Sequence, residues 1–513
     1  MSESSSRGMY RFGPSAYAGA LGSPISWLQL GALAGGMYAA YRVFTTSGIV
    51  GVPIAVCVVL ATCAVSLMPV RGREVIEWAP ILALAALRRV LGRTRRVSTS
   101  PLEGFRGSSD DPAGPGMGPD VEVPPSLKGI EIIEHVLGRE RVGIIKDRHA
   151  RTYAAVLKVR VASFGLLSSS DQQRRVDAWS TLLTSLCREG TPISRVQWLE
   201  RTIPSDPDEL VRYHLSMRDP QLKRDDDVVR SYESLISDAT AATQDHELFL
   251  VVQVSVRRAK HLIRRLADTI DEGACLLLTQ ELQTLADALL ACDIQPLGVL
   301  KARTLAKHIR LAYDPFQRRA LDRMGAFDPA QDGVSALNAW PLAERYAWDH
   351  YQTDHAVHAT YWVSEWPRRE VPVAFLFPLL LQANMQRTIS VVMEPIQTSK
   401  ALQGVEAAII GNHSSEQMRQ AKGFSQTARR AKRSHDLLQR ESELAAGYGE
   451  FRYSGYVTVS APTRDELERL CAEMENRALQ SRLSVRRLNG LHDVAFRNTL
   501  PLAHGLRGAQ GAR

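Results

Sequence analysis

The sequence predicts an α+β protein in which a two-helix transmembrane hairpin precedes cytoplasmic α/β domains. Three observations predict this class. Two apolar runs, at residues 27–44 and 49–70, lie close together near the N-terminus. Arginines follow the second run at once, and the rest of the chain alternates strand-like and helix-like segments. A bilayer core needs about 20 predominantly apolar residues in a helix, and the second run reaches that length.

Arginines predict the orientation of the hairpin. Positively charged flanks stay on the cytoplasmic side, so we expect both termini in the cytoplasm and a multi-pass protein of the cell membrane. A hairpin buried in a protein core is the alternative. Gly31 and Gly35 form a small-xxx-small pair that would let two spans pack closely. The arginines expected at lipid headgroups are Arg71, Arg73, Arg88, Arg89, Arg93, Arg95 and Arg96.

Composition indicates a folded chain with several domains. Apolar residues make up 45% of the 513 residues and charged residues 23%, which is ordinary for globular protein. The net charge of +8 is weak evidence for nucleic-acid binding, because much of the excess lies just after the apolar hairpin. The six cysteines include no C-x-x-C pair and imply no disulfide framework, which fits a reducing compartment.

Domain boundaries follow from shifts in composition. A stretch rich in Ser, Pro, Gly and Asp cannot hold a helix or a strand and predicts a linker. The chain accordingly divides into a cytoplasmic tail (1–24), the hairpin (25–70), a basic juxtamembrane helix lying on lipid or on the next domain (71–96), a flexible linker (97–128), a first α/β domain (129–330), a second α+β domain (331–505) and a C-terminal tail (506–513).

Hydrophobic periodicity predicts the elements of the first domain. Ser170 and Gln173 resemble a capping box that starts an amphipathic helix. Further helices are expected at residues 226–243 and 259–290. The expected strands are residues 130–136, 141–146, 152–161, 194–202, 248–256 and 294–300.

The second domain repeats a strand–helix–strand order twice, which predicts a ferredoxin-like split β-α-β unit. One long helix, residues 396–447, is expected to project beyond it. Thr463 and Glu466 form a capping box at the start of the other helix. The expected strands are residues 358–364, 388–394, 453–460 and 483–488.

The motifs of common enzymes are absent from the sequence. It contains no G-x-x-x-x-G-K-[ST] loop for nucleotide phosphates, no G-x-S-x-G and no H-E-x-x-H. The nearest approach to a metal site is Asp349 with His350, Asp354, His355 and His358. Alternation along a strand would send these side chains to opposite faces. We therefore expect no enzyme activity, no metal and no cofactor.

Basic residues gather on the long helix of the second domain. A basic face can follow a phosphate backbone, but it can also be solvated or meet an acidic partner protein. Direct nucleic-acid contact therefore stays open. The candidate contact residues are Arg419, Lys422, Arg429, Arg430, Lys432 and Arg433.

Four short motifs stand in order along the chain. They are residues 73–80 (REVIEWAP), 196–202 (VQWLERT), 358–367 (HATYWVSEWP) and 496–502 (FRNTLPL). Together with the apolar hairpin, this series resembles actinobacterial conjugation proteins of the PrgI-related, type IV secretion-like class. The resemblance covers most of the chain.

The resemblance implies a non-catalytic inner-membrane scaffold of a conjugative DNA-transfer apparatus. The hairpin looks like the small inner-membrane subunit, and the rest looks like the non-motor N-terminal domain of the large conjugation ATPase. The implied partners are the membrane, a separate hexameric ATPase and other secretion-system subunits, and the protein is expected to be an oligomer. The family provides no catalytic residues to transfer to this chain.

Three alternatives remain open from the sequence. The first is an EccE-like core membrane component of a type VII secretion system, a class that also has two N-terminal spans. The second is a membrane-tethered enzyme that uses the histidine cluster. The third is a stand-alone nucleic-acid-binding module that uses the long basic helix.

Overall fold

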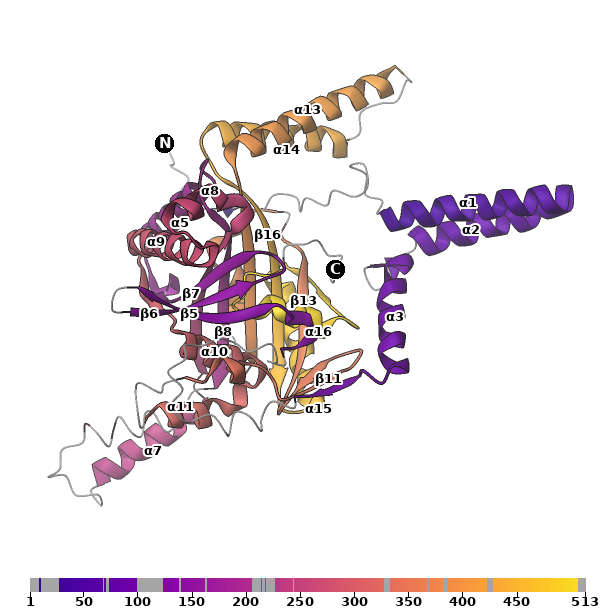
Figure 1. The fold of residues 1–513 in the computed structure, drawn as a ribbon. Helices are drawn as coiled ribbons and strands as arrows, with labels where there is room; N and C mark the ends of the chain where they lie inside the picture. The colour runs from indigo at the N-terminus through magenta and orange to yellow at the C-terminus, as the bar shows by residue number, and fades with distance from the viewer. Residues whose placement is uncertain are drawn as a thin grey trace.

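A 13-stranded antiparallel sheet forms the body of the computed structural model (Figure 1). The structure describes residues 9–10, 27–67, 69–70, 73–98, 123–137, 140–161, 164–204, 214, 217, 227–242, 244–326, 333–367, 369–381, 385–421 and 428–505. The predicted α+β class is confirmed.

The strands lie in a single path with two side branches. Their order is β4 (Arg95–Val97), β11 (Ala343–Tyr346), β12 (Tyr351–Thr353), β13 (Ala356–Glu365), β16 (Glu450–Ala461), β15 (Gln386–Ile396), β8 (Ile193–Pro204), β9 (Gln244–Ser255), β7 (Thr152–Val161), β6 (Glu140–Asp147) and β5 (Ile130–Leu137). β10 (Ile294–Val299) pairs with β7, and β17 (Ser484–Arg487) pairs with β13. Two short pairs, β1 (Met9–Tyr10) with β14 (Val371–Pro372) and β2 (Pro69–Val70) with β3 (Arg73–Glu74), lie outside this sheet.

The sheet has two halves, and each contains a unit of four strands with the same topology. In the first half, β7 pairs with β9 and β10, and β8 lies on the far side of β9. In the second half, β13 pairs with β16 and β17, and β15 lies on the far side of β16. Both halves therefore have the split β-α-β strand order that the sequence predicts only for the second.

The halves meet where β8 pairs antiparallel with β15. The register places Trp198 opposite Val391 and joins the two halves into one continuous sheet. The domain boundary at residue 330 therefore stays a prediction, since no break in the sheet accompanies it. Each half carries an insertion in its outer β-hairpin: α7 (Asp227–Ala242) in the first, and α13 (Thr398–Gln420) with α14 (Ala428–Ala445) in the second. Because β8 and β15 run in opposite directions, the insertions project from opposite ends of the sheet (Figure 1).

Helices cover both faces of the sheet. On one face, α5 (Ser169–Leu186), α8 (Val256–Leu266) and α9 (Ile270–Ala291) pack on the first half. On the second half of that face, α12 (Phe377–Leu380) and α15 (Arg464–Gln480) pack around Val457 and Val459. The other face is covered by α10 (Ala302–Tyr313), α16 (His492–Phe496) and the chain from 497 to 503.

Gln197 joins the two halves on that second face. Its side-chain nitrogen donates to the Ser390 hydroxyl at 2.8 Å and to the Leu500 carbonyl at 2.9 Å. Its side-chain oxygen accepts from the Ala503 amide at 2.8 Å. The side chain is fully buried, so these bonds satisfy polar groups that would otherwise destabilise the interior.

Most predicted strands are confirmed to within a few residues, but both long helices are wrong. Residues 259–290 form two helices, because Thr269 caps a new helix by accepting from the Glu272 amide. Residues 396–447 form α13 and α14, which pack together around Ala401, Val405 and Leu444. The first domain's opening helix is capped by Ser168 rather than Ser170. The cap at Thr463 is confirmed.

The prediction of a transmembrane hairpin, and of a multi-pass membrane location, is wrong. Among the described residues, no helix is both long and apolar enough to cross a bilayer. The second apolar run does not form one helix, because Gly48–Gly51 forms a separate turn and α2 (Val52–Leu67) has only 16 residues. The first helix, α1 (Trp27–Ser47), has 21 residues but ends in polar ones.

The juxtamembrane helix predicted within residues 71–96 packs on the next domain. It is observed as α3 (Val75–Val90), between the α1–α2 hairpin and the body (Figure 1). Trp78 contacts Trp348 with ring centroids 5.8 Å apart. Ile81 is buried, and a side chain at Gly490 would meet it.

Two of the arginines predicted to lie at lipid headgroups, Arg88 and Arg96, form ion pairs with the body of the protein. Arg88 pairs with Asp493 at 2.9 Å and stacks over Tyr346. Arg96 lies in β4 and pairs with buried Glu344 at 2.5 Å, which anchors this edge of the sheet. Arg89, Arg93 and Arg95 are exposed. Arg71 and the side chain of Arg73 lie outside the described residues. Residues 99–122 of the predicted linker also lie outside them.

Candidate functional site

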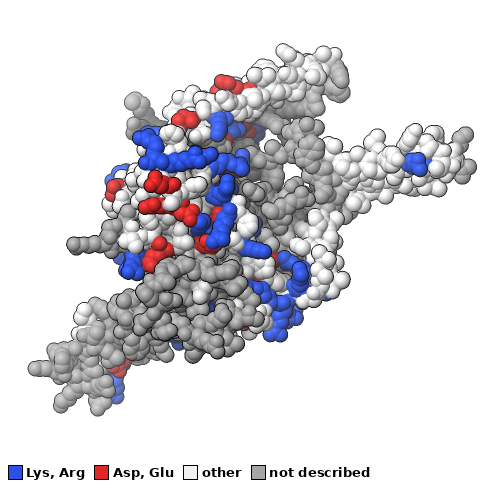
Figure 2. Space-filling model, viewed as in Figure 1, with Lys and Arg blue, Asp and Glu red and all other residues white. Residues whose placement is uncertain are grey.

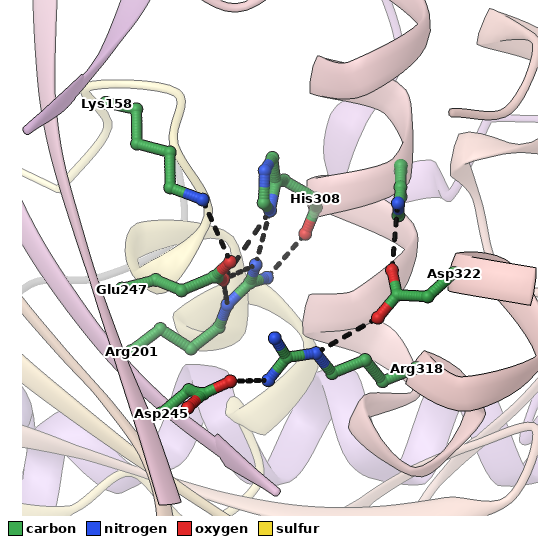
Figure 3. Close-up of polar contacts among 8 residues, drawn as sticks. Lys158, Arg201, Asp245, Glu247, His308, Arg318 and Asp322 are labelled. Carbon is green, nitrogen blue, oxygen red and sulfur yellow. Dashed lines mark hydrogen bonds and ion pairs between the residues drawn. The ribbon is translucent and has the colours of Figure 1, made fainter. Parts of the chain in front are cut away.

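A buried cluster of charged side chains joins β8, β9 and α10 (Figure 3). Arg201 from β8 donates to the Glu247 carboxylate from β9 at 2.6 Å. The same guanidinium donates to the His308 carbonyl at 2.6 Å and lies 2.8 Å from His308 Nδ1. Lys158 approaches Glu247 from the neighbouring β7, with 3.5 Å between Nζ and Oε1.

A second set of ion pairs extends the cluster toward α11 (Arg318–Ala326). Arg318 pairs with Asp245 at 2.6 Å and with Asp322 at 3.3 Å. Lys307 pairs with Asp322 at 2.9 Å. In Figure 3 the two sets lie side by side, so α10 and α11 are both tied to the end of β9.

Burial and charge set the protonation states at the centre of the cluster. Burial alone would raise the pKa of Glu247, but the charges of His308 and Arg201 outweigh it and hold the pKa well below its ordinary value. Burial lowers the pKa of His308, against the charge and hydrogen bond of Glu247.

The described cavity beside the cluster is too small for a substrate. A cavity of about 10 Å³ lies beside it, lined by Arg201, His308 and apolar side chains such as Phe249. That volume holds about one water molecule at most. The charged side chains of the cluster pair with one another and hold α10 and α11 on the sheet.

The sequence analysis missed these residues because they are distant in the chain. Arg201 and Glu247 are charged residues within strands that are otherwise largely buried. A charge in such a strand is costly to bury unless it is paired. That anomaly is the signal that could have pointed to the cluster.

The predicted histidine cluster is not brought together. His358 is buried and bonded to the Ser460 hydroxyl and the Tyr313 carbonyl. His355 pairs with Asp314, and His350 bonds to its neighbour Asp349. Asp354 pairs with Arg310 at 2.7 Å. Within the described part of the chain, no three His, Cys, Asp or Glu side chains are placed to hold a metal ion.

The basic candidates of the predicted long helix fall around the junction of α13 and α14. Lys422 and the side chains of Arg419, Arg429, Arg430 and Arg433 lie outside the described residues. Lys432 is exposed on α14. Their proposed contact with a partner or nucleic acid thus stays a prediction.

The α1–α2 hairpin has a largely apolar exposed surface. It stands away from the body (Figure 1), and Arg42 is its one charged residue. Met37 is 69% exposed and Leu60 is 63% exposed. The other exposed large apolar side chains on the two helices are Leu30, Tyr38, Tyr41, Phe44, Val52, Ile54, Val56, Val59 and Val65.

The two helices are held together by close packing and one buried bond. A side chain at Gly36 would lie 2.5 Å from Thr62 of α2, whereas Gly31 and Gly35 face open space. The predicted role of Gly31 and Gly35 in helix packing is therefore wrong, and Gly36 takes that role. Gln29 donates to the Ser66 carbonyl at 2.9 Å, and both residues are buried.

No protein-family model matches this chain, and no curated protein matches it at a significant level.

Proposed function

We propose that the protein is a non-catalytic scaffold subunit of a type IV secretion-like conjugative apparatus, and that a separate ATPase docks on it. The observation that carries the proposal is the projecting α1–α2 hairpin. Its two helices expose many large apolar side chains, and exposed apolar surface of this kind marks a binding site for another protein.

The chemistry of the hairpin limits what can cover it. With Arg42 as the one charge on α1 and α2, the surface offers few groups for ion pairs. A partner of matching character presents apolar helices, as in helix-on-helix packing. We assign this role to the ATPase subunit that the sequence resemblance implies.

Three further features support a scaffold role. The sequence lacks a G-x-x-x-x-G-K-[ST] loop, so the energy for transfer would come from another subunit. The insertions α7 and α13–α14 project from opposite ends of the sheet (Figure 1), which gives the body separate attachment points. The charged cluster in Figure 3 is consistent with a rigid body that carries them.

Gene deletion and complementation test the function. Deletion is expected to abolish conjugal DNA transfer without slowing growth, and the wild-type gene should restore it. A variant with Ile54→Ser, Val56→Ser and Leu60→Ser should fail to restore transfer. The matched control is Leu290→Ser, Leu381→Ser and Leu479→Ser, which removes three exposed leucines scattered over the body.

Normal transfer in the deletion strain would overturn the proposal. Loss of secretion of small helical proteins, with transfer intact, would identify a type VII role in its place. Equal complementation by the two triple variants would leave the scaffold role but remove the hairpin from it.

A further inference from the structure

Helix α8 carries an exposed basic face that the sequence analysis did not single out. Its inward side chains Ala259 and Ile263 are buried, and Leu262 and Leu266 pack against the same core. Its outward side chains are all basic: Arg257, Lys260, His261, Arg264 and Arg265 are exposed. Residues 260, 261, 264 and 265 are spaced by three and four positions, which places them on one side of a helix.

The first turn of α8 deviates from this regular spacing. The backbone at Ala259 has φ −108° and ψ 16°, outside helical geometry. Arg257 is therefore assigned to the basic face because its side chain is exposed, and not because of its spacing from the other basic residues. The amide of Val256 donates to the Arg151 carbonyl at 3.1 Å, so exposed Arg151 adjoins the start of the helix.

These cations are not neutralised within the described part of the chain. Arg257, Lys260, Arg264 and Arg265 make no ion pair with an Asp or Glu there. The neighbouring Arg258 differs, since it is half-buried and feels the charges of Glu394 and Glu189. In Figure 2, Lys and Arg side chains form a band that passes over α8 and continues across the adjoining face.

The composition of the face distinguishes between two classes of partner. Protein interfaces have an apolar core and are depleted in Lys. No large apolar side chain of α8 is exposed, so the face has no such core. Interfaces with nucleic acid are polar and strongly positive, and arginine binds phosphate with two parallel hydrogen bonds.

We propose that α8 binds the phosphate backbone of nucleic acid through Arg257, Lys260, Arg264 and Arg265. Contact to phosphates carries no sequence information, so binding is independent of sequence. The helix has no Phe, Tyr or Trp for base stacking, which makes duplex DNA a suitable ligand. The inference rests on α8 alone and holds whether or not the chain serves in conjugation.

The geometry fits backbone contact along a short stretch of duplex. Lys260 and Arg264 are one helical turn apart, about 6 Å along the axis. Duplex DNA presents phosphates every 3.4 Å or so along each strand. A face of this length therefore meets about four phosphates, counting those of both strands.

Fluorescence anisotropy with the purified full-length protein tests the proposal. The probe is a labelled duplex of about 20 base pairs, titrated at several salt concentrations. With about four phosphates neutralised, the affinity should fall roughly a hundredfold between 50 and 200 mM salt. The variant Arg257→Gln, Lys260→Gln, Arg264→Gln and Arg265→Gln should lose this binding and most of its salt dependence.

A matched control removes the same charge elsewhere. The variant Arg89→Gln, Arg469→Gln, Arg477→Gln and Arg482→Gln changes four surface arginines away from α8, and it should bind within about threefold of wild type. If the first variant does not fold, Arg257→Lys, Arg264→Lys and Arg265→Lys should fold and keep binding, because the charge is retained.

Two results would overturn the proposal. One is equal affinity of the α8 variant and the control variant for the duplex. The other is displacement of the duplex by polyglutamate at equal charge concentration, which would identify α8 as a surface for an acidic protein.

Discussion

The sheet body and the α1–α2 hairpin differ in how far their apolar side chains are buried. In the body, apolar side chains from both faces are buried under helices, and even charged residues such as Arg201 are enclosed and paired. In the hairpin, nearly every large apolar side chain of α2 is exposed, and the helices touch through Gly36 and Thr62. The body thus buries its own apolar side chains, whereas most large apolar side chains of the described part of α2 stay exposed.

This difference indicates which substitutions should change the free energy of unfolding and which should change binding. Buried apolar area is the main favourable term in folding, so substitutions in the body should act on the free energy of unfolding. Substitutions on the hairpin surface should leave that free energy unchanged and act on binding.

Breaking the buried cluster should have the largest effect. Arg201→Met leaves the Glu247 carboxylate buried without its main partner, and loss of one member of a buried pair costs about 3–5 kcal/mol. Chemical denaturation measures the change. The double variant Arg201→Met/Glu247→Leu should lose less than the sum of the two single variants, and strict additivity would show that the cluster does not couple β8 to β9.

Truncation of matched leucines should separate body from hairpin. Leu278 in α9 is fully buried, so Leu278→Ala should lower the free energy of unfolding by about 2–5 kcal/mol. Leu60→Ala in the hairpin should change it by less than about 0.5 kcal/mol. Similar losses for both variants would mean that the hairpin is part of the folding core.

Acid should weaken the body through its buried histidines. Burial lowers the pKa of His358 to about 4, while its hydrogen bond to the Tyr313 carbonyl acts in the opposite direction. Since the unfolded chain binds the proton at about pH 6.5, stability is full above that pH and falls as pH drops toward 4. Between pH 6.5 and 5 the loss from this residue is about 2 kcal/mol.

The variant His358→Gln provides the comparison for that pH dependence. Its unfolding free energy should fall less steeply between pH 6.5 and 5 than that of the wild type. The two curves would run parallel if His358 were protonated in the folded protein.

Gly36 and Gly35 offer a matched pair within the hairpin. Gly36→Leu collides with Thr62, whereas Gly35→Leu enters open space. We expect amide hydrogen exchange in α1 and α2 to speed up about tenfold in the first variant, from a local cost of about 1–3 kcal/mol. Gly35→Leu should exchange like wild type, and the body should be unaffected in both. Equal exchange in the two variants would contradict the observed packing.

Local patterns in the sequence were enough to find most strands. The run at residues 152–161 predicts β7 with its observed bounds, because alternation and β-branched residues are local signals. Helix ends were less well predicted. The Thr269–Glu272 capping box that starts α9 was available in the sequence but was overridden by continuous helical periodicity.

Long-range pairing and the buried cluster could not be predicted. The pairing of β8 with β15, which joins the two halves, depends on contacts between residues distant in the chain. The same holds for the contact between Arg201 and His308. The two apolar runs were recognised from the sequence, but each was assumed to be helical over its whole length. The turn at Gly48–Gly51 shortens the helix formed by the second run.

Co-purification from the native cells tests whether the α1–α2 hairpin docks an ATPase. Tagged wild-type protein, the triple serine variant at Ile54, Val56 and Leu60, and the control at Leu290, Leu381 and Leu479 are recovered in parallel, and the bound proteins are identified. The account predicts a motor ATPase bound to the wild type and the control but lost from the hairpin variant. Recovery of the ATPase with all three proteins, or with none of them, would contradict it.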